Sequence, residues 1–323
     1  MKALETIING VLNGNLLSKA HAMELIGLTA EDDILALAHA ANTVRKTFTS
    51  NTIDFCSLVN AKSGCCSEDC AFCAQSGHYQ TEITSYDLLS VNTIVDRARE
   101  AERSGAKHFC IVTSGAALND SEFDQVLKAY KLICAETNLR IDGSLGMLSE
   151  NKIRRLKEAG IARYNHNLET SERFFPTICT THSYADRLRT LRTLRQHDIE
   201  VCSGGIIGMG EAKEDRVDLA LALRAEQVQC IPINILNPRK GTPLENVSRI
   251  TPLEAIATIA VFRLINPHAT IKIAGGREAG LGEYQQLSLE AGGNGFIVGG
   301  YLTTPGNIYQ DDHAIARRAG YDI

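Results

Sequence analysis

The chain has 323 residues, of which 44% are apolar, 22% charged and 6% aromatic. A chain of this size and composition can bury a large core, which excludes a collagen-like, coiled-coil, extensively disordered or disulfide-stapled protein. The net charge of −5 provides no basic field for nucleic acid or an anionic membrane, and no transmembrane run or signal-peptide stretch is visible, so we expect a cytoplasmic location.

The first 50 residues have the pattern of helices. Apolar side chains recur at helical spacing at Leu4, Ile7, Ile8, Val11 and Leu12. Ser18 is in place to cap a second helix, and Thr29 with Asp32 resembles a capping arrangement before a third. We therefore predict that residues 1–50 form a helical extension that packs on the domain behind it.

From about residue 53, short β-rich runs alternate with amphipathic helical stretches. The predicted strands are Ile53–Val59, His108–Thr113, Arg140–Leu145, Ala162–Asn167, Glu200–Ile207, Gln229–Ile235, Thr270–Ala274 and Gly295–Val298. The predicted helices are Thr93–Arg103, Phe123–Glu136, Asn151–Ala159, Tyr184–His197, Glu214–Glu226, Pro252–Leu264 and Leu281–Ala291. Gly105, Gly160 and Gly292 follow helical stretches where C-terminal caps belong.

Strand–helix alternation predicts parallel strands joined by right-handed crossovers. Eight predicted strands in residues 51–323 match a (β/α)8 TIM-type barrel, which typically has about 250 residues. A doubly wound open sheet is the alternative. Because no linker or low-complexity segment divides residues 51–323, we predict one barrel domain there.

Ten cysteines stand out in a chain expected to lie in a reducing compartment. Cys66, Cys70 and Cys73 follow the first predicted strand with CxxxCxxC spacing, so one wrapped loop can bring three thiolates together. Thiolates favour zinc, Cu(I) and iron–sulfur clusters. Three ligands suit a four-iron cubane with one open iron, whereas a structural zinc site needs a fourth ligand, which Cys65 or His78 could provide.

The place of this loop in a barrel suggests catalysis. Barrel enzymes keep their chemistry on the loops at the C-terminal ends of the strands, so the loop would lie over the mouth. Phe72, between the last two cysteines, would put an aromatic ring beside the open iron, where an adenine can pack.

The cysteine loop and five later segments resemble the radical S-adenosylmethionine superfamily and, within it, the biotin synthase family. The matching segments stand in the family's order: SGCCSEDCAFCAQS, YNHNLETS (Tyr164–Ser171), VCSGGIIGMGE (Val201–Glu211), IPIN (Ile231–Asn234), AGGRE (Ala274–Glu278) and YLTTPG (Tyr301–Gly306).

This resemblance implies an enzyme that inserts sulfur into dethiobiotin to form biotin. Cys66, Cys70 and Cys73 would hold a [4Fe–4S] cluster whose open iron binds the amino and carboxylate groups of S-adenosylmethionine. One electron would yield a 5′-deoxyadenosyl radical that abstracts hydrogen at C9 and C6, and an auxiliary iron–sulfur cluster would donate the sulfur. The cofactors would supply the radical chemistry, while the protein supplies position and exclusion of water.

Polar residues end the fourth predicted strand. Strand alternation places Asn165, Asn167 and Glu169 on one face and His166 on the other, where a packed or hydrogen-bonded histidine is expected. Buried amides and carboxylates need partners, which a polar ligand would provide. The resemblance implies cofactor contacts for Phe72, Asn165, Asn167, Glu169 and Arg187, and substrate contacts for Asn167 and Asn234.

The auxiliary cluster is matched less completely. The family holds it with three cysteines and an arginine from the second, third, fifth and seventh strands, and Cys110, Cys202 and Arg277 match three of these. Asp142 stands where the third-strand cysteine would be, and a carboxylate can bind Fe(III). Cys179 offers another thiol after the fourth strand. We therefore expect a [2Fe–2S] or larger four-iron cluster held by Cys110, Cys179 and Cys202, with Arg277 or Asp142 as a ligand or hydrogen-bonding neighbour.

Three other cysteines, Cys56, Cys134 and Cys230, have no such support and are predicted as core. Two other functions stay open. The missing third-strand cysteine favours a radical enzyme without sulfur insertion, such as a maturase or mutase, and the zinc interpretation favours a metal-stabilised binding protein. The resemblance also implies an electron donor of the flavodoxin or ferredoxin type and a homodimer.

Overall fold

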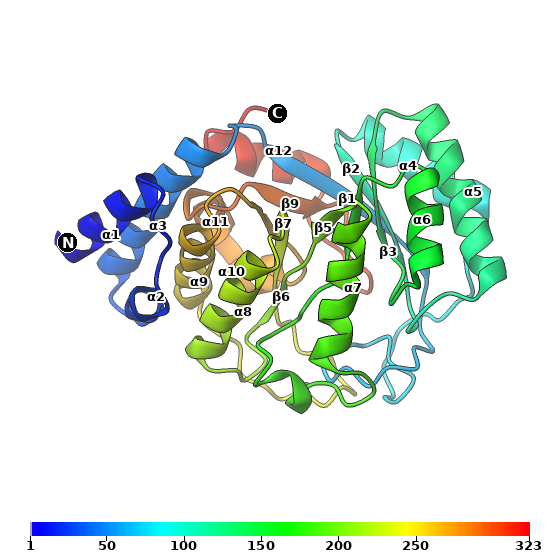
Figure 1. Cartoon of the computed structure of the whole chain (residues 1–323), viewed down its shortest axis with the longest axis horizontal. Coiled ribbons are helices and arrows are strands. Elements are labelled where there is room, and N and C mark those ends of the chain that lie inside the picture. The colour runs from blue at the N-terminus through cyan, green and yellow to red at the C-terminus, as the bar shows by residue number, and fades with distance from the viewer. Residues whose placement is uncertain (1) are drawn as a thin grey trace.

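The computed structural model describes residues 2–323, with side chains from residue 4 onward. A barrel of parallel strands lies at its centre, helices surround the barrel, and α1 to α3 stand at one side (Figure 1). The strands are β1 (Asp54–Lys62), β2 (His108–Thr113), β3 (Arg140–Ser144), β4 (Arg163–Asn165), β5 (Glu200–Cys202), β6 (Gly205–Ile207), β7 (Cys230–Ile235), β8 (Thr270–Ile273) and β9 (Gly295–Val298).

The helices cover the outside of the barrel and its N-terminal side. They are α1 (Lys2–Leu12), α2 (Lys19–Ile26), α3 (Glu31–Phe48), α4 (Val91–Arg103), α5 (Asp120–Glu136), α6 (Glu150–Glu158), α7 (Tyr184–Gln196), α8 (Lys213–Ala225), α9 (Pro252–Ile265), α10 (Arg277–Leu281), α11 (Gln285–Glu290) and α12 (Tyr309–Arg318). Short 3₁₀ turns lie at Phe175–Thr177 and Gly282–Tyr284.

The sheet closes on itself. The strands pair in the order β5-β4-β3-β2-β1-β9-β8-β7-β6, and β5 also pairs with β7. All of these pairings are parallel. β5 and β6 are two halves of one barrel position, so the nine strands fill eight positions. The predicted (β/α)8 TIM-type barrel is confirmed, and the doubly wound alternative is wrong.

The strand predicted over Glu200–Ile207 is broken between β5 and β6. A Cβ atom on Gly204 would lie 1.9 Å from the carbonyl oxygen of Pro232, so β7 and this segment approach more closely than a side chain permits. The Gly204 N–H leaves the ladder and donates to Asn167 Oδ1 at 3.2 Å. The break therefore ties the backbone between β5 and β6 to the segment that follows β4.

Most predicted helix boundaries hold. Ser18 caps α2 by accepting from the His21 N–H, and Gly105, Gly160 and Gly292 have φ values of 93°, 92° and 101° after α4, α6 and α11. The cap predicted at Thr29 is wrong, because α3 begins after Ala30, which makes no side-chain capping bond. The acidic first turn of α3 stabilises the helix dipole instead.

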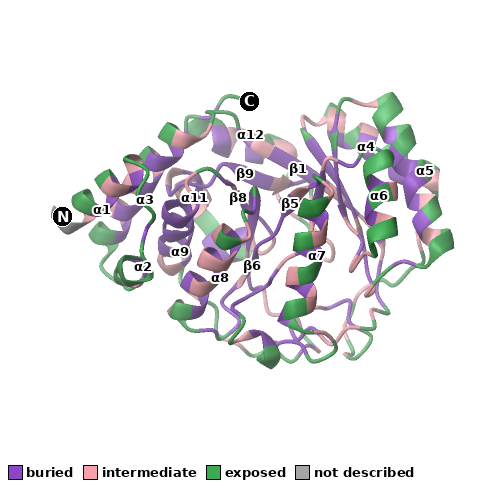
Figure 2. Ribbon diagram, viewed as in Figure 1, coloured by how far each residue is buried: buried purple, intermediate pink, exposed green. Residues whose placement is uncertain are grey.

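The helical extension covers an apolar helix. All residues of α9 from Ala255 to Ile265 are buried, as expected for a helix that is apolar all round. α2 and α3 pack against α9 on the side away from the strands (Figure 2). The proposed boundary between residues 50 and 51 stays a prediction, since the extension and the barrel share this packing.

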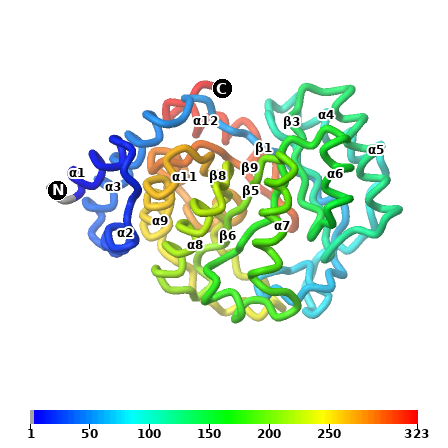
Figure 3. The backbone as a smooth tube through the Cα atoms, viewed as in Figure 1, coloured from blue at the N-terminus to red at the C-terminus, as the bar shows by residue number. Residues whose placement is uncertain are grey.

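The C-terminal residues lie beside the segment that leads into β1, whereas α1 stands apart at the far end of the helical extension (Figure 3). Thr52 pairs with Asp322, and Asn51 Nδ2 donates to the Gly320 carbonyl at 2.9 Å. α12, which was not predicted, packs on the outer face of β1, where Tyr309 and Ser57 hydroxyls are 2.9 Å apart. The chain therefore closes the barrel with a final helix beside the first strand.

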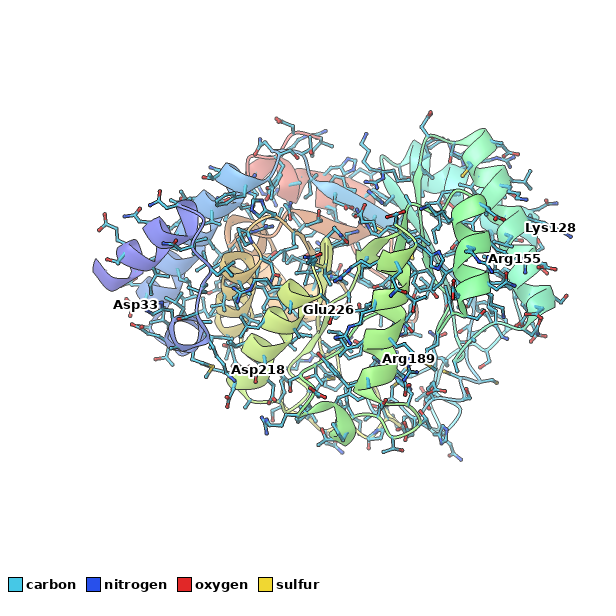
Figure 4. All side chains as sticks on the ribbon, viewed as in Figure 1. Asp33, Lys128, Arg155, Arg189, Asp218 and Glu226 are labelled. Carbon is cyan, nitrogen blue, oxygen red and sulfur yellow. The ribbon has the colours of Figure 1, made fainter. Side chains whose placement is uncertain are left out.

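The outer helices carry charges of both signs. Arg155 of α6 bonds Asp124 of α5 at 2.5 Å, and Asp218 of α8 pairs with Lys19 of α2 at 2.7 Å. Charged side chains project outward in Figure 4 at Asp33, Lys128, Arg155, Arg189 and Asp218, whereas Glu226 pairs with Arg192 at 2.6 Å. None of the helices in residues 2–323 combines the length and apolar character that crossing a bilayer requires.

Candidate active site

A cavity of about 410 Å³ opens at the C-terminal ends of the strands. A volume of this order holds a small organic ligand. The loops that follow β1 and β4 gather at this end, at the lower edge of Figure 1. Nine of the predicted site residues line the cavity: Cys66, Cys70, Phe72, Cys73, Asn165, Asn167, Glu169, Arg187 and Asn234.

The three motif cysteines are brought together by a loop that folds back on itself. Cys66 pairs with Ser76, and the Gly77 N–H donates to the Cys66 carbonyl at 2.7 Å. Burial, together with the neighbouring Cys66 thiol, raises the pKa of Cys73 to about 11. Cys65 is exposed and is absent from the cavity lining. The loop thus presents three thiols to one space.

This cysteine loop is clamped onto the loop between β4 and α7. The Ala71 N–H donates to the Ile178 carbonyl at 2.8 Å, and Asp69 accepts from the Thr180 N–H at 2.9 Å. Glu68 accepts from His182 at 2.5 Å. Three hydrogen bonds to one chain segment, the loop between β4 and α7, therefore hold the cysteine loop over the mouth.

Cys179 lies with the cysteine loop. Its Sγ is 3.8 Å from Cys70 Sγ, and Cys70, Cys179 and His182 have ligand atoms within 4.8 Å of one another. The hydrogen bond from Cys70, together with those of His182, lowers the pKa of Cys179. Burial alone would lower the pKa of His182, but its bonds to Cys179 and Glu68 raise it. Three ligand atoms this close suit a single soft ion, but this trio is not the set that the zinc interpretation required, namely the three motif cysteines with Cys65 or His78.

The predicted grouping of Cys179 with Cys110 and Cys202 is therefore corrected. Cys110 lies on β2 and Cys202 on β5, both inside the barrel, whereas Cys179 contacts Cys70 at the mouth. The 3₁₀ turn at Phe175–Thr177 directs the chain back toward the cysteine loop, which position in sequence did not reveal.

The polar end of β4 lines the cavity, although not by strand alternation. β4 ends at Asn165, and Glu169 has a φ of 68°, so the chain leaves extended geometry between them. Consequently His166 also lines the cavity, and its predicted place on the opposite face is wrong. Burial lowers the pKa of His166 well below its usual value, and the charges of Arg187 and His182 lower it further.

Three side chains of this segment support one another. Arg187 Nη1 donates to the Asn167 carbonyl at 2.8 Å and lies 3.7 Å from Glu169 Oε1. Asn167 Nδ2 donates to Glu169 Oε2 at 3.4 Å. Burial raises the pKa of Glu169, and Arg187 opposes that shift. The carboxylate and its guanidinium are thus fixed at the cavity wall.

Two asparagine side chains face the cavity, and they differ in whether their oxygen atoms have hydrogen-bond partners. Asn165 Oδ1 is buried and has no hydrogen-bond partner in the part of the chain that the structure describes. Asn234 accepts from the Gly275 N–H at 2.9 Å and donates to the Gly205 carbonyl at 3.2 Å. Since a buried acceptor without a partner is costly, Asn165 is the clearest sign that a polar ligand completes the cavity.

Arg277 does not face the barrel interior, which corrects its predicted role as a cluster ligand. Its guanidinium binds Asp312 of α12 at 2.8 and 3.1 Å and lies 3.9 Å from the ring centroid of Phe296. Ile297 lines the cavity, so its neighbour Phe296 on β9 points outward. Arg277 is therefore held in the outer layer between β9 and α12.

A layer of polar residues fills the barrel beneath the cavity. Asp142 is buried there, and His108 Nδ1 holds its carboxylate at 3.0 Å. Lys272 of β8 and Arg163 of β4 bind Asp54 at 3.1 and 3.0 Å. Sequence reasoning passed over these two cations, although Lys272 stands alone among apolar residues of a strand, which signals an inward lysine.

Family models match most of the chain. The model described as the Radical SAM superfamily matches residues 62–223, and the Biotin and Thiamin Synthesis associated domain matches residues 232–322. The first covers all three motif cysteines and the polar end of β4.

Curated relatives match over nearly the full length. The chain is 45% identical to a biotin synthase of Acetivibrio thermocellus over 100% of both chains. It is 45% identical to one of Picosynechococcus over 98% of this chain and 89% of the relative. The identity is 49% to one of Heliobacterium modesticaldum, over 90% of this chain and 89% of the relative.

Solved structures share the fold. Methylornithine synthase superposes with a TM-score of 0.79 at 20% identity, covering 90% of this chain and 85% of that one. The FeFe-hydrogenase maturase HydG of Carboxydothermus hydrogenoformans gives 0.82 at 16% identity, covering 99% and 79%.

Proposed function

The chain belongs to the biotin synthase family of the radical S-adenosylmethionine superfamily, and from that membership we propose which of its residues serve the reaction. The reaction is a sulfur insertion that converts dethiobiotin to biotin. When bound, S-adenosylmethionine, the [4Fe–4S] cluster and the auxiliary cluster supply a 5′-deoxyadenosyl radical and the inserted sulfur. The observation that carries this function is one cavity lined by three motif thiols and the polar end of β4.

Cys66, Cys70 and Cys73 are the proposed ligands of the [4Fe–4S] cluster. Their donor chemistry fits, since thiolates are the usual ligands of such clusters. The two bonds from Asp69 and Glu68 to the loop before α7 keep the three thiols over the cavity. Three protein thiols leave one iron for the amino and carboxylate groups of S-adenosylmethionine.

The cavity walls are proposed to orient the two organic molecules. Asn165 offers a free buried acceptor, Glu169 a carboxylate for an ammonium group, and Arg187 holds Glu169 and the Asn167 backbone in place. Asn167 and Asn234 present amides to the ureido ring of dethiobiotin. Phe72, at the cavity wall, is the proposed contact of the adenine. A lined cavity also keeps water from the reacting carbon atoms.

Cys110 and Cys202 are proposed as auxiliary-cluster ligands, with Asp142 beside them. The two cysteines are buried on inward strands beneath the cavity, where sulfur would lie next to the substrate. Further proposals concern the whole protein: an electron donor of the flavodoxin or ferredoxin type, a homodimer, a cytoplasmic location, and a division into residues 1–50 and 51–323.

The test is a product analysis under anaerobic conditions. Reconstituted protein is incubated with S-adenosylmethionine, a reductant and dethiobiotin, and products are measured by mass spectrometry. We expect biotin with 5′-deoxyadenosine, both abolished in Cys70→Ala and both retained in Cys65→Ala, the matched neighbour outside the cavity.

Two other outcomes would contradict the proposal. 5′-Deoxyadenosine without biotin, from protein whose auxiliary cluster is demonstrably loaded, would favour a radical enzyme with another substrate. A colourless protein that carries one zinc after anaerobic purification, and forms neither product after reconstitution, would favour the metal-stabilised binding protein.

A further inference from the structure

Four cysteines that lie on four different strands point into the barrel beneath the cavity. On β1, Leu58 lines the cavity, so Cys56, two residues earlier, faces the same interior. The intervening residues face outward, because Phe55 stacks on His313 and Ser57 bonds Tyr309, both of α12. Cys56, which sequence reasoning assigned to the core, is therefore an inward thiol.

The same alternation places the other three thiols. Cys110 on β2 stands two residues before Val112, which lines the cavity, and Cys230 on β7 stands two residues before Pro232, which also lines it. Cys202 on β5 is the register partner of both Asn165 and Cys230. The register sets Cys110 opposite Leu58 and Cys202 opposite Asn165, and both partners line the cavity. The four thiols thus lie in one interior level of the barrel that reaches from the cavity floor to about one two-residue step below it.

These thiols share one electrostatic environment. Cys56 Sγ is 3.9 Å from Asp142 Oδ2, which is 3.7 Å from Arg163 Nη1, and that nitrogen is 3.4 Å from Cys230 Sγ. Lys272 is a second buried cation of this interior and binds Asp54 at 3.1 Å, and Asp54 also binds Arg163 at 3.0 Å. The positive charges of these two buried cations can therefore balance the negative charge of thiolates.

The composition of this level is unlike a barrel core. Barrel interiors are filled mainly by Val, Ile and Leu, whereas here four thiols are gathered from four strands. Within the described residues no three of them converge within 4.8 Å, as the ligands of a single ion do. A cluster of several irons is the group whose ligands stand further apart, and four cysteines are the usual set for [4Fe–4S].

We propose that Cys56, Cys110, Cys202 and Cys230 together ligate the auxiliary cluster, and that this four-thiol set selects a four-iron cluster over a two-iron one. The inference rests on the proposed function and deepens it, because it names the ligands of the sulfur-donating group. Asp142, held by His108, and the cations Arg163 and Lys272 then surround the cluster as charged neighbours. Each thiol releases its proton when it binds iron.

The test removes the upper cluster first. In full-length Cys66→Ala/Cys70→Ala/Cys73→Ala protein, reconstituted anaerobically, remaining iron and sulfide report the lower site alone. We expect about four irons per chain and a Mössbauer signal of a four-iron cluster. Adding Cys56→Ala or Cys230→Ala should reduce the bound iron at least twofold, whereas Cys134→Ala, an exposed cysteine on α5, should leave it unchanged.

Other outcomes would overturn the assignment. Two irons per chain, or four irons that persist in both Cys56→Ala and Cys230→Ala, would show that these two thiols are not ligands. Far-UV circular dichroism checks that each variant folds. If a variant with an interior substitution fails to fold, the iron count of the triple variant still decides between a two-iron and a four-iron cluster. Biotin formation by the unsubstituted protein tests the proposed function separately. Failure of the ligand assignment is therefore distinguishable from failure of the proposed function.

Discussion

Asn165 shows how a single side chain can mark a ligand site. Its Oδ1 atom is buried without a partner, yet its place at the cavity wall makes it available to a bound molecule. A residue that gives little to the folded state and faces a cavity is best explained by binding.

We predict that Asn165→Ala weakens binding of S-adenosylmethionine by about tenfold, the worth of roughly one hydrogen bond. The free energy of unfolding of the unloaded chain should not fall, because no internal bond of Oδ1 is lost. Calorimetric titration of the reconstituted protein measures the affinity. Asn92→Ala, an exposed asparagine on α4, is the control, and equal affinities in all three proteins would contradict the prediction.

His166 gives the cavity a dependence on pH. Because the folded state holds its pKa below the usual value of about 6.5, the unfolded chain binds a proton first as pH falls. Stability contributed by neutral His166 is therefore present above about pH 6.5 and is lost below it, by up to about 1.4 kcal/mol per pH unit.

Urea unfolding of the unloaded chain at pH 7.5 and 5.5 measures this loss. His166→Asn should reduce the difference between the two pH values, whereas His21→Asn, an exposed histidine on α2, should not. An unchanged difference in His166→Asn would assign the acid sensitivity to other groups.

At the scale of residues, the sequence predicted which residues form the site better than it predicted where their side chains point. The three motif cysteines and the polar residues after β4 all reach the cavity, because a motif carries its own local geometry. Arg277 was misassigned because it follows β8 as the first residue of α10, where strand alternation no longer applies. Lys272, one residue before the end of the same strand, points inward and binds Asp54.

At the scale of elements, the break between β5 and β6 is the least ordinary feature. Gly204 approaches the Pro232 carbonyl so closely that a Cβ atom would lie 1.9 Å from it. We predict that Gly204→Ala destabilises the chain by about 1–3 kcal/mol and disturbs the cavity wall through Asn167.

The matched control is Gly10→Ala in α1, whose added methyl group would meet only the Asn15 side chain, at 3.7 Å or more. That substitution should stabilise the chain by about 0.5–1 kcal/mol, since glycine is unfavourable inside a helix. Thermal unfolding of both variants checks the opposite signs, and two variants of equal stability would refute the argument.

Strands and helices of the barrel were predictable because hydrophobic periodicity is local. His108–Thr113 and Gly295–Val298 match β2 and β9 residue for residue. The split of the fifth strand was not predictable, because it depends on contact with β7. α12 was missed because it follows the last strand, and the predicted alternation of strands and helices ended at that strand.

At the scale of the whole molecule, the N-terminal helices are part of the barrel's stability. α9 is buried on all sides only because α2 and α3 cover it. We predict that deleting residues 1–50 exposes α9 and yields aggregated protein, detected by gel filtration and light scattering. A monodisperse, cooperatively unfolding fragment 51–323 would contradict this.

A point variant tests the same packing without truncation. Leu37 of α3 is fully buried, so Leu37→Asp should destabilise the chain by about 3–5 kcal/mol, as expected when an apolar contact is lost and a charge is buried unpaired. Asp33→Asn, an exposed position on the same helix (Figure 4), should change stability by less than about 0.5 kcal/mol.

The barrel interior is filled at its base and opens into the cavity at its C-terminal end. At its base Asp54, Arg163 and Lys272 form a buried network of ion pairs, while the cavity opens at the other end under the cysteine loop. In the proposed ligand assignment, iron and sulfide for the interior thiols would pass the position of the upper cluster. That assignment therefore implies an order of maturation, in which the lower cluster is loaded before the cofactor at the mouth.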